Sequence, residues 1–269
     1  MTFFSHRRET VNTATIVPLH PTGVLVQISD TLTLLDFGID QLRSWIDQYR
    51  MVVLRGIQSP DDHQMRKFCE RLGTILEWEF GAVNELTVKQ DSKSYLYTNR
   101  EVPFHWDGAF VGKIPHYIFF HCQVAPQQGS GGETTFCDTI KLLQSLTPGE
   151  LSQWSKISVT YRTEKIVHYG GEFTSPLIMP HPYLKQNVLR FAEPVKDLNP
   201  VTLEVHGLST DEAADLVPRM HELLNAPDFC YAHPWQTNDI VIADNHALLH
   251  GRRPFTTATQ RHLRRINVL

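Results

Sequence analysis

Two stretches, Phe104-His-Trp-Asp-Gly108 and Asn245-His-Ala-Leu-Leu-His-Gly-Arg-Arg-Pro254, decide the fold and chemistry that we expect for this chain. In an extended segment alternate side chains leave on the same face, so His105 and Asp107 can reach one ion together. His250, from a distant strand, would complete a face of two imidazoles and one carboxylate and leave coordination positions open. This donor set favours ferrous iron, because the four cysteines are scattered and form no zinc or iron–sulfur motif.

A His-x-Asp triplet alone is weak evidence, because a chain with 14 histidines and 29 acidic residues produces such triplets by chance. The alternative is a surface or hydrogen-bonded pair without a metal. The segment after His250 favours a site, because a strand-like ending carries Arg261, Arg264 and Arg265. A buried guanidinium is costly unless it meets an anion, and its planar fork matches a carboxylate. The turn at 129–135, Gly-Ser-Gly-Gly-Glu-Thr-Thr, offers hydroxyls that could bind the same anion.

The order and spacing of these motifs resemble the TauD/TfdA family of Fe(II)- and 2-oxoglutarate-dependent dioxygenases. The motifs that carry the resemblance are Met51–Gly56, Phe104–Gly108, Gly131–Thr134, His250–Arg252 and Arg261–Arg265. The resemblance extends over most of the chain. It implies a jelly-roll fold, a bound Fe(II), and 2-oxoglutarate and O2 as co-substrates.

Carried over residue by residue, the resemblance implies that His105, Asp107 and His250 bind iron. It also implies that Thr134 and Arg261 hold the distal carboxylate of 2-oxoglutarate, and that Arg265 lies near the substrate. His246 competes for the third metal position because it lies four residues before His250. The family spacing to Arg261 selects His250 instead and leaves His246 with a structural role.

The implied substrate is a small, amino-acid-derived metabolite oxidised at a C–H bond by hydroxylation or desaturation. The segment Leu189-Arg-Phe-Ala-Glu-Pro-Val195, together with His-Trp-Asp-Gly, is similar to the PvcB-like branch. Members of that branch convert isonitrile derivatives of aromatic amino acids to vinyl isonitriles by oxidative decarboxylation. Tyr169, with Phe110 and Phe173, could line a pocket for the ring, and Arg190 could bind a substrate carboxylate. Alternatively, Arg190 pairs with Glu193 or faces solvent.

Other functions fit parts of the pattern. A non-catalytic jelly-roll protein could bind 2-oxoglutarate and metal, although a pure binder has no need for open coordination positions. A zinc hydrolase could use the same three ligands, and its activity would not need oxygen. Within oxygenase chemistry, hydroxylation of a small aliphatic acid is the second choice.

Composition agrees with one catalytic domain over residues 1–269. With 41% hydrophobic and 20% charged residues, the chain can bury a large core. A formal charge of −4 gives no field that would attract nucleic acid. No stretch approaches about 18 uninterrupted apolar residues, so we expect a cytoplasmic protein without a membrane partner. The oligomeric state stays open.

The expected fold class is mainly β with flanking helices (α+β), in a double-stranded β-helix or jelly roll, although composition alone fits an unrelated sandwich. Apolar spacing predicts helices over 39–50, from Ser59 to Gly73, and over 210–224. Strands are predicted at 51–55, 117–125, 134–137, 157–162, 188–191, 229–232, 239–243 and 264–269. Segment 163–182, rich in glycine and proline, is expected to be a loop that serves as a lid or as plain surface.

Overall fold

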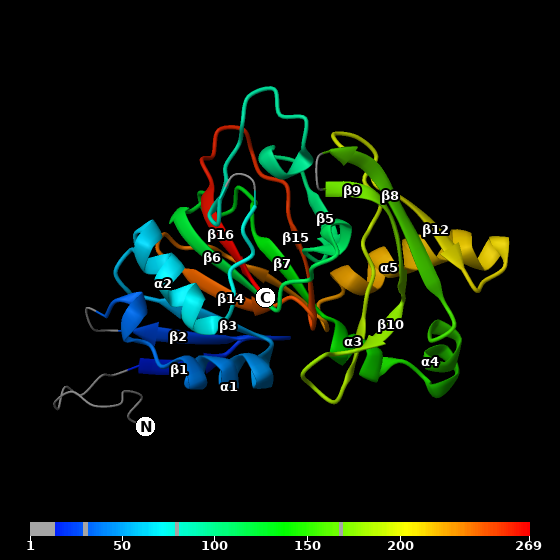
Figure 1. Ribbon diagram of the computed structural model, residues 1–269, viewed down its shortest axis with the longest axis horizontal. Helices are drawn as coiled ribbons and strands as arrows, with labels where there is room; N and C mark the ends of the chain where they lie inside the picture. Colours follow the sequence, from blue (N-terminus) through cyan, green and yellow to red (C-terminus); the bar gives the residue numbers. More distant parts are fainter. Residues whose placement is uncertain (1–13, 29–31, 79–80, 167–168) are drawn as a thin grey trace.

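The computed structural model describes residues 14–28, 32–78, 81–166 and 169–269, in which two β-sheets face each other and smaller sheets and helices flank them (Figure 1). The larger sheet has seven strands in the order β1 (Ala14–Pro18), β2 (Val24–Ile28), β3 (Met51–Arg55), β14 (Ile240–Asp244), β6 (Tyr117–Val124), β16 (His262–Val268) and β4 (Asn84–Leu86). The smaller sheet has the order β13 (Cys230–His233), β7 (Thr134–Asp138), β15 (Leu248–Arg252) and β5 (Val102–His105).

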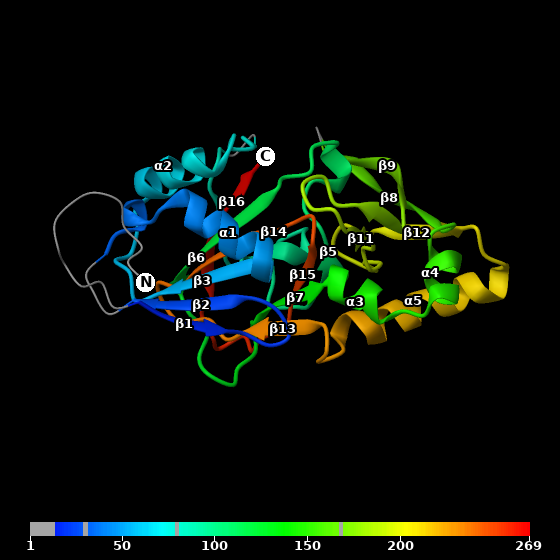
Figure 2. The ribbon, with the colours of Figure 1, turned by 90° about the horizontal axis from the view of Figure 1, so that it is seen from below.

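Two further sheets and the helices lie around this sandwich. The sheets are β12 (Thr202–His206), β8 (Ser158–Ile166) and β9 (Tyr169–Pro176), and β10 (Ile178–Pro180) with β11 (Asn187–Leu189). The α-helices are α1 (Ile39–Tyr49), α2 (Asp62–Leu72), α3 (Thr139–Ser145), α4 (Pro148–Trp154) and α5 (Thr210–Asn225). Short 3-10 helices are η1 (Leu34–Asp36), η2 (Tyr95–Tyr97) and η3 (Ala109–Val111). Figure 2 shows α2 and α5 at opposite ends of the molecule.

The central strands are apolar on both faces because both faces of the larger sheet are covered. In β3, Val52 and Leu54 pack into the core that also contains residues of α1 and α2. Met51 and Val53, which leave the strand on the other side, pack into the core between the two large sheets. The mainly antiparallel strands and the packed double sheet confirm the predicted jelly roll.

The helix predictions are confirmed for α1, α2 and α5, with corrections at the ends. Helix α2 begins two residues later than expected, because the side chain of Asp61, not Ser59, caps the helix by accepting the hydrogen bond of the Gln64 amide. Ser209 caps α5 in place of Thr210. Helices α3 and α4 were not predicted, since seven residues show less than two turns of apolar periodicity. No helix in the described ranges is long and apolar enough to cross a membrane.

The prediction of a loop over 163–182 is wrong, because much of the segment is sheet. Strand β9 pairs antiparallel with β8, and β10 pairs with β11. Gly170 and Gly171 take positive φ within β9, a conformation that other residues rarely adopt, so glycine does not break this strand. The two strands shift register between Thr163 and Ile166. Residues 167–168, including His168, lie outside the described residues.

Candidate metal centre

Strand pairing brings the two predicted histidine ligands together. His250 of β15 lies directly opposite His105 of β5 in the antiparallel register, and their ring centroids are 4.3 Å apart. Asp107 follows two residues after His105, as the alternation of side chains predicts. Its Oδ1 lies 3.7 Å from His105 Nε2 and 3.8 Å from His250 Nε2. All three candidate ligand atoms lie within 4.8 Å of one another, so one ion can reach them all.

The hydrogen bonds of the imidazoles leave their Nε2 atoms available to a metal. His105 Nδ1 lies 2.9 Å from the carbonyl oxygen of Pro103, which can only accept, so Nδ1 carries the proton. The buried Nε2 of His250 has no hydrogen-bond partner among the described groups. Burial lowers the pKa of His105 and lowers that of His250 to about 3. Both rings are therefore neutral near pH 7, which is the form that binds a metal.

Asp107 stays ionised although it is buried. Burial alone raises the pKa of a carboxyl group, but the charge of Arg265, together with the hydrogen bond from Asn267, holds the pKa of Asp107 below its ordinary value. Oδ2 lies 2.9 Å from Nη1 of Arg265 and accepts a 3.1 Å hydrogen bond from Asn267. Oδ1 faces the two imidazoles and accepts one hydrogen bond from Arg265 Nη1 at 3.1 Å. Two neutral imidazoles and one charged carboxylate fit Fe(II).

A narrow cavity of about 40 Å³ extends from the two histidines to Arg261 and Thr134. The Arg261 guanidinium donates to the carbonyl oxygen of Gly132 at 2.7 Å and to Thr134 Oγ1 at 3.0 Å. Burial lowers the pKa of Arg261 to about 9. No carboxylate in the described ranges forms an ion pair with this guanidinium. The charge of Glu133 acts on Arg261 only from beyond ion-pair distance, and a buried cation that no carboxylate contacts matches an anionic ligand.

A second cavity, of about 410 Å³, meets the candidate metal centre on its other side. Leu96, His105 and Arg265 line both cavities, which therefore adjoin beside His105. The wall of the large cavity is mainly apolar and includes seven aromatic residues, Trp78, Tyr95, Tyr97, Trp106, Phe110, Tyr161 and Phe173. Phe173 of β9 stacks on Tyr161 of β8 with ring centroids 5.0 Å apart.

The structure brings together most of the predicted site residues but places Arg190, one of the expected substrate contacts, elsewhere. Arg190 lines neither cavity: its guanidinium lies 5.5 Å from the ring centroid of Trp106 and donates to the carbonyl oxygen of Asn245. Tyr169 begins β9, and its side chain lies outside the described part of the structure. Asn267 was missed, although it follows Arg265 by two residues and so leaves β16 on the same face.

Comparison with known proteins agrees with this geometry. The model of the taurine catabolism dioxygenase TauD, TfdA family matches residues 15–267. The chain belongs to the TauD/TfdA family. It is 43% identical over 256 residues to a 3-((Z)-2-isocyanoethenyl)-1H-indole synthase of Fischerella ambigua, covering 93% of this chain and 94% of that one. It is 33% identical over 233 residues to a tyrosine isonitrile desaturase of Pseudomonas aeruginosa, covering 84% and 80%.

A solved structure supports the same assignment. PvcB, described as an Fe, alpha-ketoglutarate dependent oxygenase from an isonitrile synthetic pathway, superposes with a TM-score of 0.78 at 28% identity. The superposition covers all of this chain and 95% of PvcB. The chain is thus an Fe(II)- and 2-oxoglutarate-dependent oxygenase that acts on a small molecule. These relatives support neither a non-catalytic binding protein nor a zinc hydrolase.

Proposed function

We propose that this oxygenase, as one catalytic domain, converts an isonitrile derivative of an aromatic amino acid to the vinyl isonitrile by oxidative decarboxylation. The observation that carries the proposal is a His105–Asp107–His250 centre placed between an arginine-ended cavity and a large aromatic one. An indole-bearing substrate is the first choice, because the indole enzyme of Fischerella ambigua shares 43% of its aligned residues with this chain.

In this proposal His105, Asp107 and His250 hold Fe(II), which supplies the activation of O2 when bound. Arg261 and Thr134 hold the distal carboxylate of 2-oxoglutarate through charge-assisted and hydroxyl hydrogen bonds. The 40 Å³ cavity that they close leads directly to His105 and His250. Anchoring one end of the co-substrate there orients its other end toward the iron.

The aromatic cavity positions the substrate side chain. Its volume of about 410 Å³ lies in the range of small-ligand sites, roughly 300–1,000 Å³. Phe110 meets Phe173 edge-on with ring centroids 4.8 Å apart, so a planar ring can join the same edge-and-face packing. Because Tyr161 and Phe173 come from the β8–β9 hairpin, we retain the proposal that segment 163–182 closes over the substrate.

The reaction balances with one O2 and one 2-oxoglutarate. One oxygen atom enters succinate while 2-oxoglutarate loses CO2. The other leaves as water, with two electrons and one proton from the substrate and a second proton from solvent. The substrate loses its carboxylate as CO2 and a β-hydrogen, and the double bond forms between its α- and β-carbons.

The test is product analysis by mass spectrometry with the isonitriles of tryptophan and tyrosine, in the presence of Fe(II), 2-oxoglutarate and O2. The expected product has lost CO2 and two hydrogens, with one succinate formed for each product. A product that gains one oxygen atom would contradict decarboxylation and indicate hydroxylation. Turnover of neither isonitrile, by protein that still consumes 2-oxoglutarate slowly, would contradict the substrate class. Asp107→Ala serves as the inactive control.

A further inference from the structure

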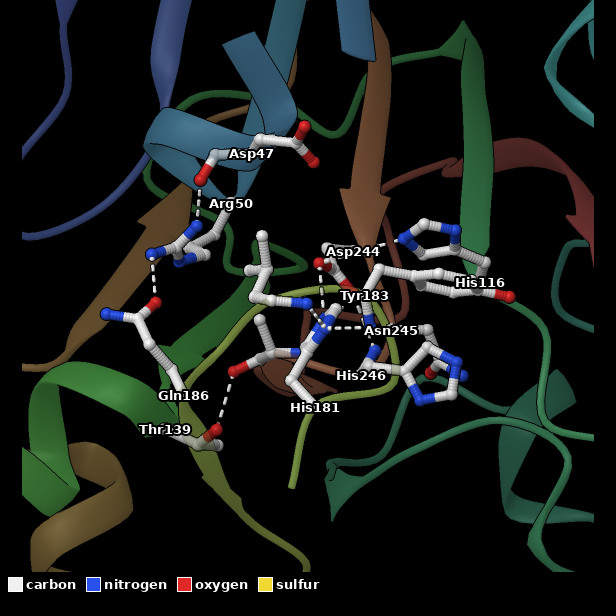
Figure 3. Close-up of polar contacts among 12 residues, drawn as sticks. Asp47, Arg50, His116, Thr139, His181, Tyr183, Gln186, Asp244, Asn245 and His246 are labelled. Atoms are coloured by element: carbon white, nitrogen blue, oxygen red, sulfur yellow. Dashed lines mark hydrogen bonds and ion pairs between the residues drawn. The ribbon is translucent and has the colours of Figure 1, made fainter. Parts of the chain in front are cut away.

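A second group of two histidines and one carboxylate lies in the same molecule. His116 precedes β6, His181 follows β10 and Asp244 ends β14, so three distant segments meet there (Figure 3). Their candidate ligand atoms lie within 4.8 Å of one another, as they do in the proposed iron centre. Residue composition alone therefore does not distinguish the two groups.

The hydrogen bonds of His181 do distinguish them. Its Nδ1 lies 3.1 Å from the amide nitrogen of Tyr183 and 3.0 Å from that of Leu184, and both amides can only donate. The proton is therefore on Nε2, which donates to Asp244 Oδ2 at 2.9 Å. His105 has the opposite polarity, since its Nδ1 donates to a carbonyl oxygen. A metal needs a ring nitrogen without a proton, so His181 serves Asp244 and not an ion.

Asp244 in turn holds a tight turn. Its Oδ1 accepts hydrogen bonds from the amides of His246 at 2.8 Å and Ala247 at 3.2 Å. The carboxylate is fully buried, and its interactions with His181 and His116 outweigh burial and hold the pKa of Asp244 below its ordinary value. An ionised carboxylate that accepts from a histidine and two amides is satisfied without a metal.

Asn245, inside this turn, forms hydrogen bonds to both polar backbone groups of Asp107, and we call this pair of bonds the clasp. Its side-chain Oδ1 accepts from the amide of Asp107 at 2.9 Å, and its Nδ2 donates to the carbonyl oxygen of Asp107 at 3.1 Å. The same Nδ2 donates to the carbonyl oxygen of Pro115 at 2.9 Å. Asn245 is 1% exposed, so water does not compete for these bonds. Both polar backbone groups of the carboxylate ligand are thus held by one side chain.

Arg190 fixes the turn from the other side. Its Nη1 donates to the carbonyl oxygen of Asn245 at 2.9 Å, and its Nη2 lies 2.7 Å from His246 Nδ1. Its guanidinium also lies over the ring of Trp106, the residue between His105 and Asp107. Arg190 therefore contacts the backbone around the candidate metal centre, whereas the sequence suggested a substrate carboxylate, Glu193 or solvent.

We propose that Asn245 is the positioning residue for Asp107, and that the His116–His181–Asp244 group sets its turn and binds no metal. The proposal rests on the proposed role of Asp107 as an iron ligand. The proposal explains why four buried polar side chains meet at a turn that carries no iron ligand. Asp244 and Asn245 belong to the turn, and His181 and Arg190 contact it from other segments. Loss of the clasp frees the Asp107 backbone while leaving the three ligand side chains in place.

The first experiment counts metal. Anaerobic Fe(II) titration, with metal analysis after removal of excess ion, is expected to give one tightly bound iron per chain. Asp107→Ala is expected to lose that iron, and His116→Ala is expected to keep it. A second tightly bound iron that disappears in His116→Ala would overturn the assignment of the second group. Iron retained by Asp107→Ala would instead overturn the proposed function, so the two failures are distinguishable.

The second experiment weakens the clasp. Asn245→Asp keeps an acceptor for the Asp107 amide, but it replaces the donating amide nitrogen by an oxygen that faces the carbonyl oxygens of Asp107 and Pro115. Asn245→Ala removes all three hydrogen bonds. Both variants are expected to bind Fe(II) about 10- to 100-fold more weakly, as changes in groups that orient metal ligands do. Asn225→Ala, which removes one exposed amide contact at the end of α5, is the matched control. Unchanged Fe(II) affinity in folded Asn245→Asp or Asn245→Ala would overturn the proposal.

A third measurement needs no variant and covers the case in which both substitutions unfold the chain. Hydrogen exchange followed by NMR in the metal-free wild-type protein is expected to show strong protection of the Asp107 amide. A merely structural role of Asn245 elsewhere would not protect this amide. Exchange of the Asp107 amide as fast as that of an exposed loop would overturn the proposal.

Discussion

Replacing Arg261 by glutamine separates the function of this guanidinium from its effect on the fold. Arg261 is 4% exposed and donates only to Gly132 and Thr134 among its described hydrogen bonds. Burial lowers the pKa of Arg261 to about 9, so the folded protein without co-substrate gains little from this charge. Glutamine is shorter and neutral, and its amide can still donate to one of these oxygens.

The expected loss follows from the bond that disappears. A hydrogen bond to a charged group contributes about 1.5–3 kcal/mol, so losing the charged contact weakens 2-oxoglutarate binding by about 10- to 150-fold. The metal-free protein is expected to unfold at the same or a slightly higher temperature, because an unpaired buried cation has been removed. The two effects therefore have opposite signs.

Anaerobic titration of the Fe(II)-loaded protein with 2-oxoglutarate, followed by the visible charge-transfer absorption, measures the first effect, and thermal unfolding of the metal-free protein measures the second. Arg253→Gln, an exposed arginine one residue from Arg252, is the matched control. Equal co-substrate affinity in wild type and Arg261→Gln would refute the assignment. If Arg253→Gln weakened 2-oxoglutarate binding by the same factor, the effect would be general charge attraction and not a specific contact of Arg261 with the co-substrate.

Three further outcomes are expected. His250→Ala should lose tightly bound Fe(II) and turnover together, and retention of one iron per chain would remove this residue from the centre. Phe110→Ala should raise the KM for an aromatic isonitrile about tenfold through loss of roughly 1.5 kcal/mol of ring packing, with 2-oxoglutarate affinity unchanged in the same kinetics. Burial and Arg264 lower the pKa of His121 to about 4, so the unfolded chain binds more protons below pH 6.5. Stability should then fall by on the order of 3 kcal/mol between about pH 6.5 and 4, and His121→Gln should show a smaller loss in urea unfolding.

Part of the candidate metal centre could be predicted because His105 and Asp107 lie two residues apart and depend only on local geometry. Side-chain alternation predicted that His105 and Asp107 share one face. The roles of Arg261 and Thr134 came from the resemblance to the TauD/TfdA family, and only the structure shows that the two side chains are in contact. Side-chain alternation, applied one step further along β16, would have found Asn267. The helices α1 and α5 were predicted because each runs for three turns or more with one apolar face.

The rest depends on contacts between distant segments. The pairing of β15 with β5 puts His250 opposite His105, and a slip of one residue would turn His250 to the other face. Arg190 reads as a substrate contact in isolation, but the turn after β14 supplies its acceptors. The glycines and prolines of 163–182 indicated a loop, whereas pairing with β8 makes most of the segment a strand.

The two histidine–carboxylate groups show why residue type alone does not identify a metal ligand. An imidazole has two nitrogens, and whatever contacts one of them decides what the other can do. A backbone carbonyl beside Nδ1 of His105 leaves its Nε2 lone pair for a metal, whereas two backbone amides beside Nδ1 of His181 put a proton on the nitrogen that faces Asp244. These backbone contacts are the reason that we propose iron at the first group, and support of Asn245, and through it of Asp107, for the second.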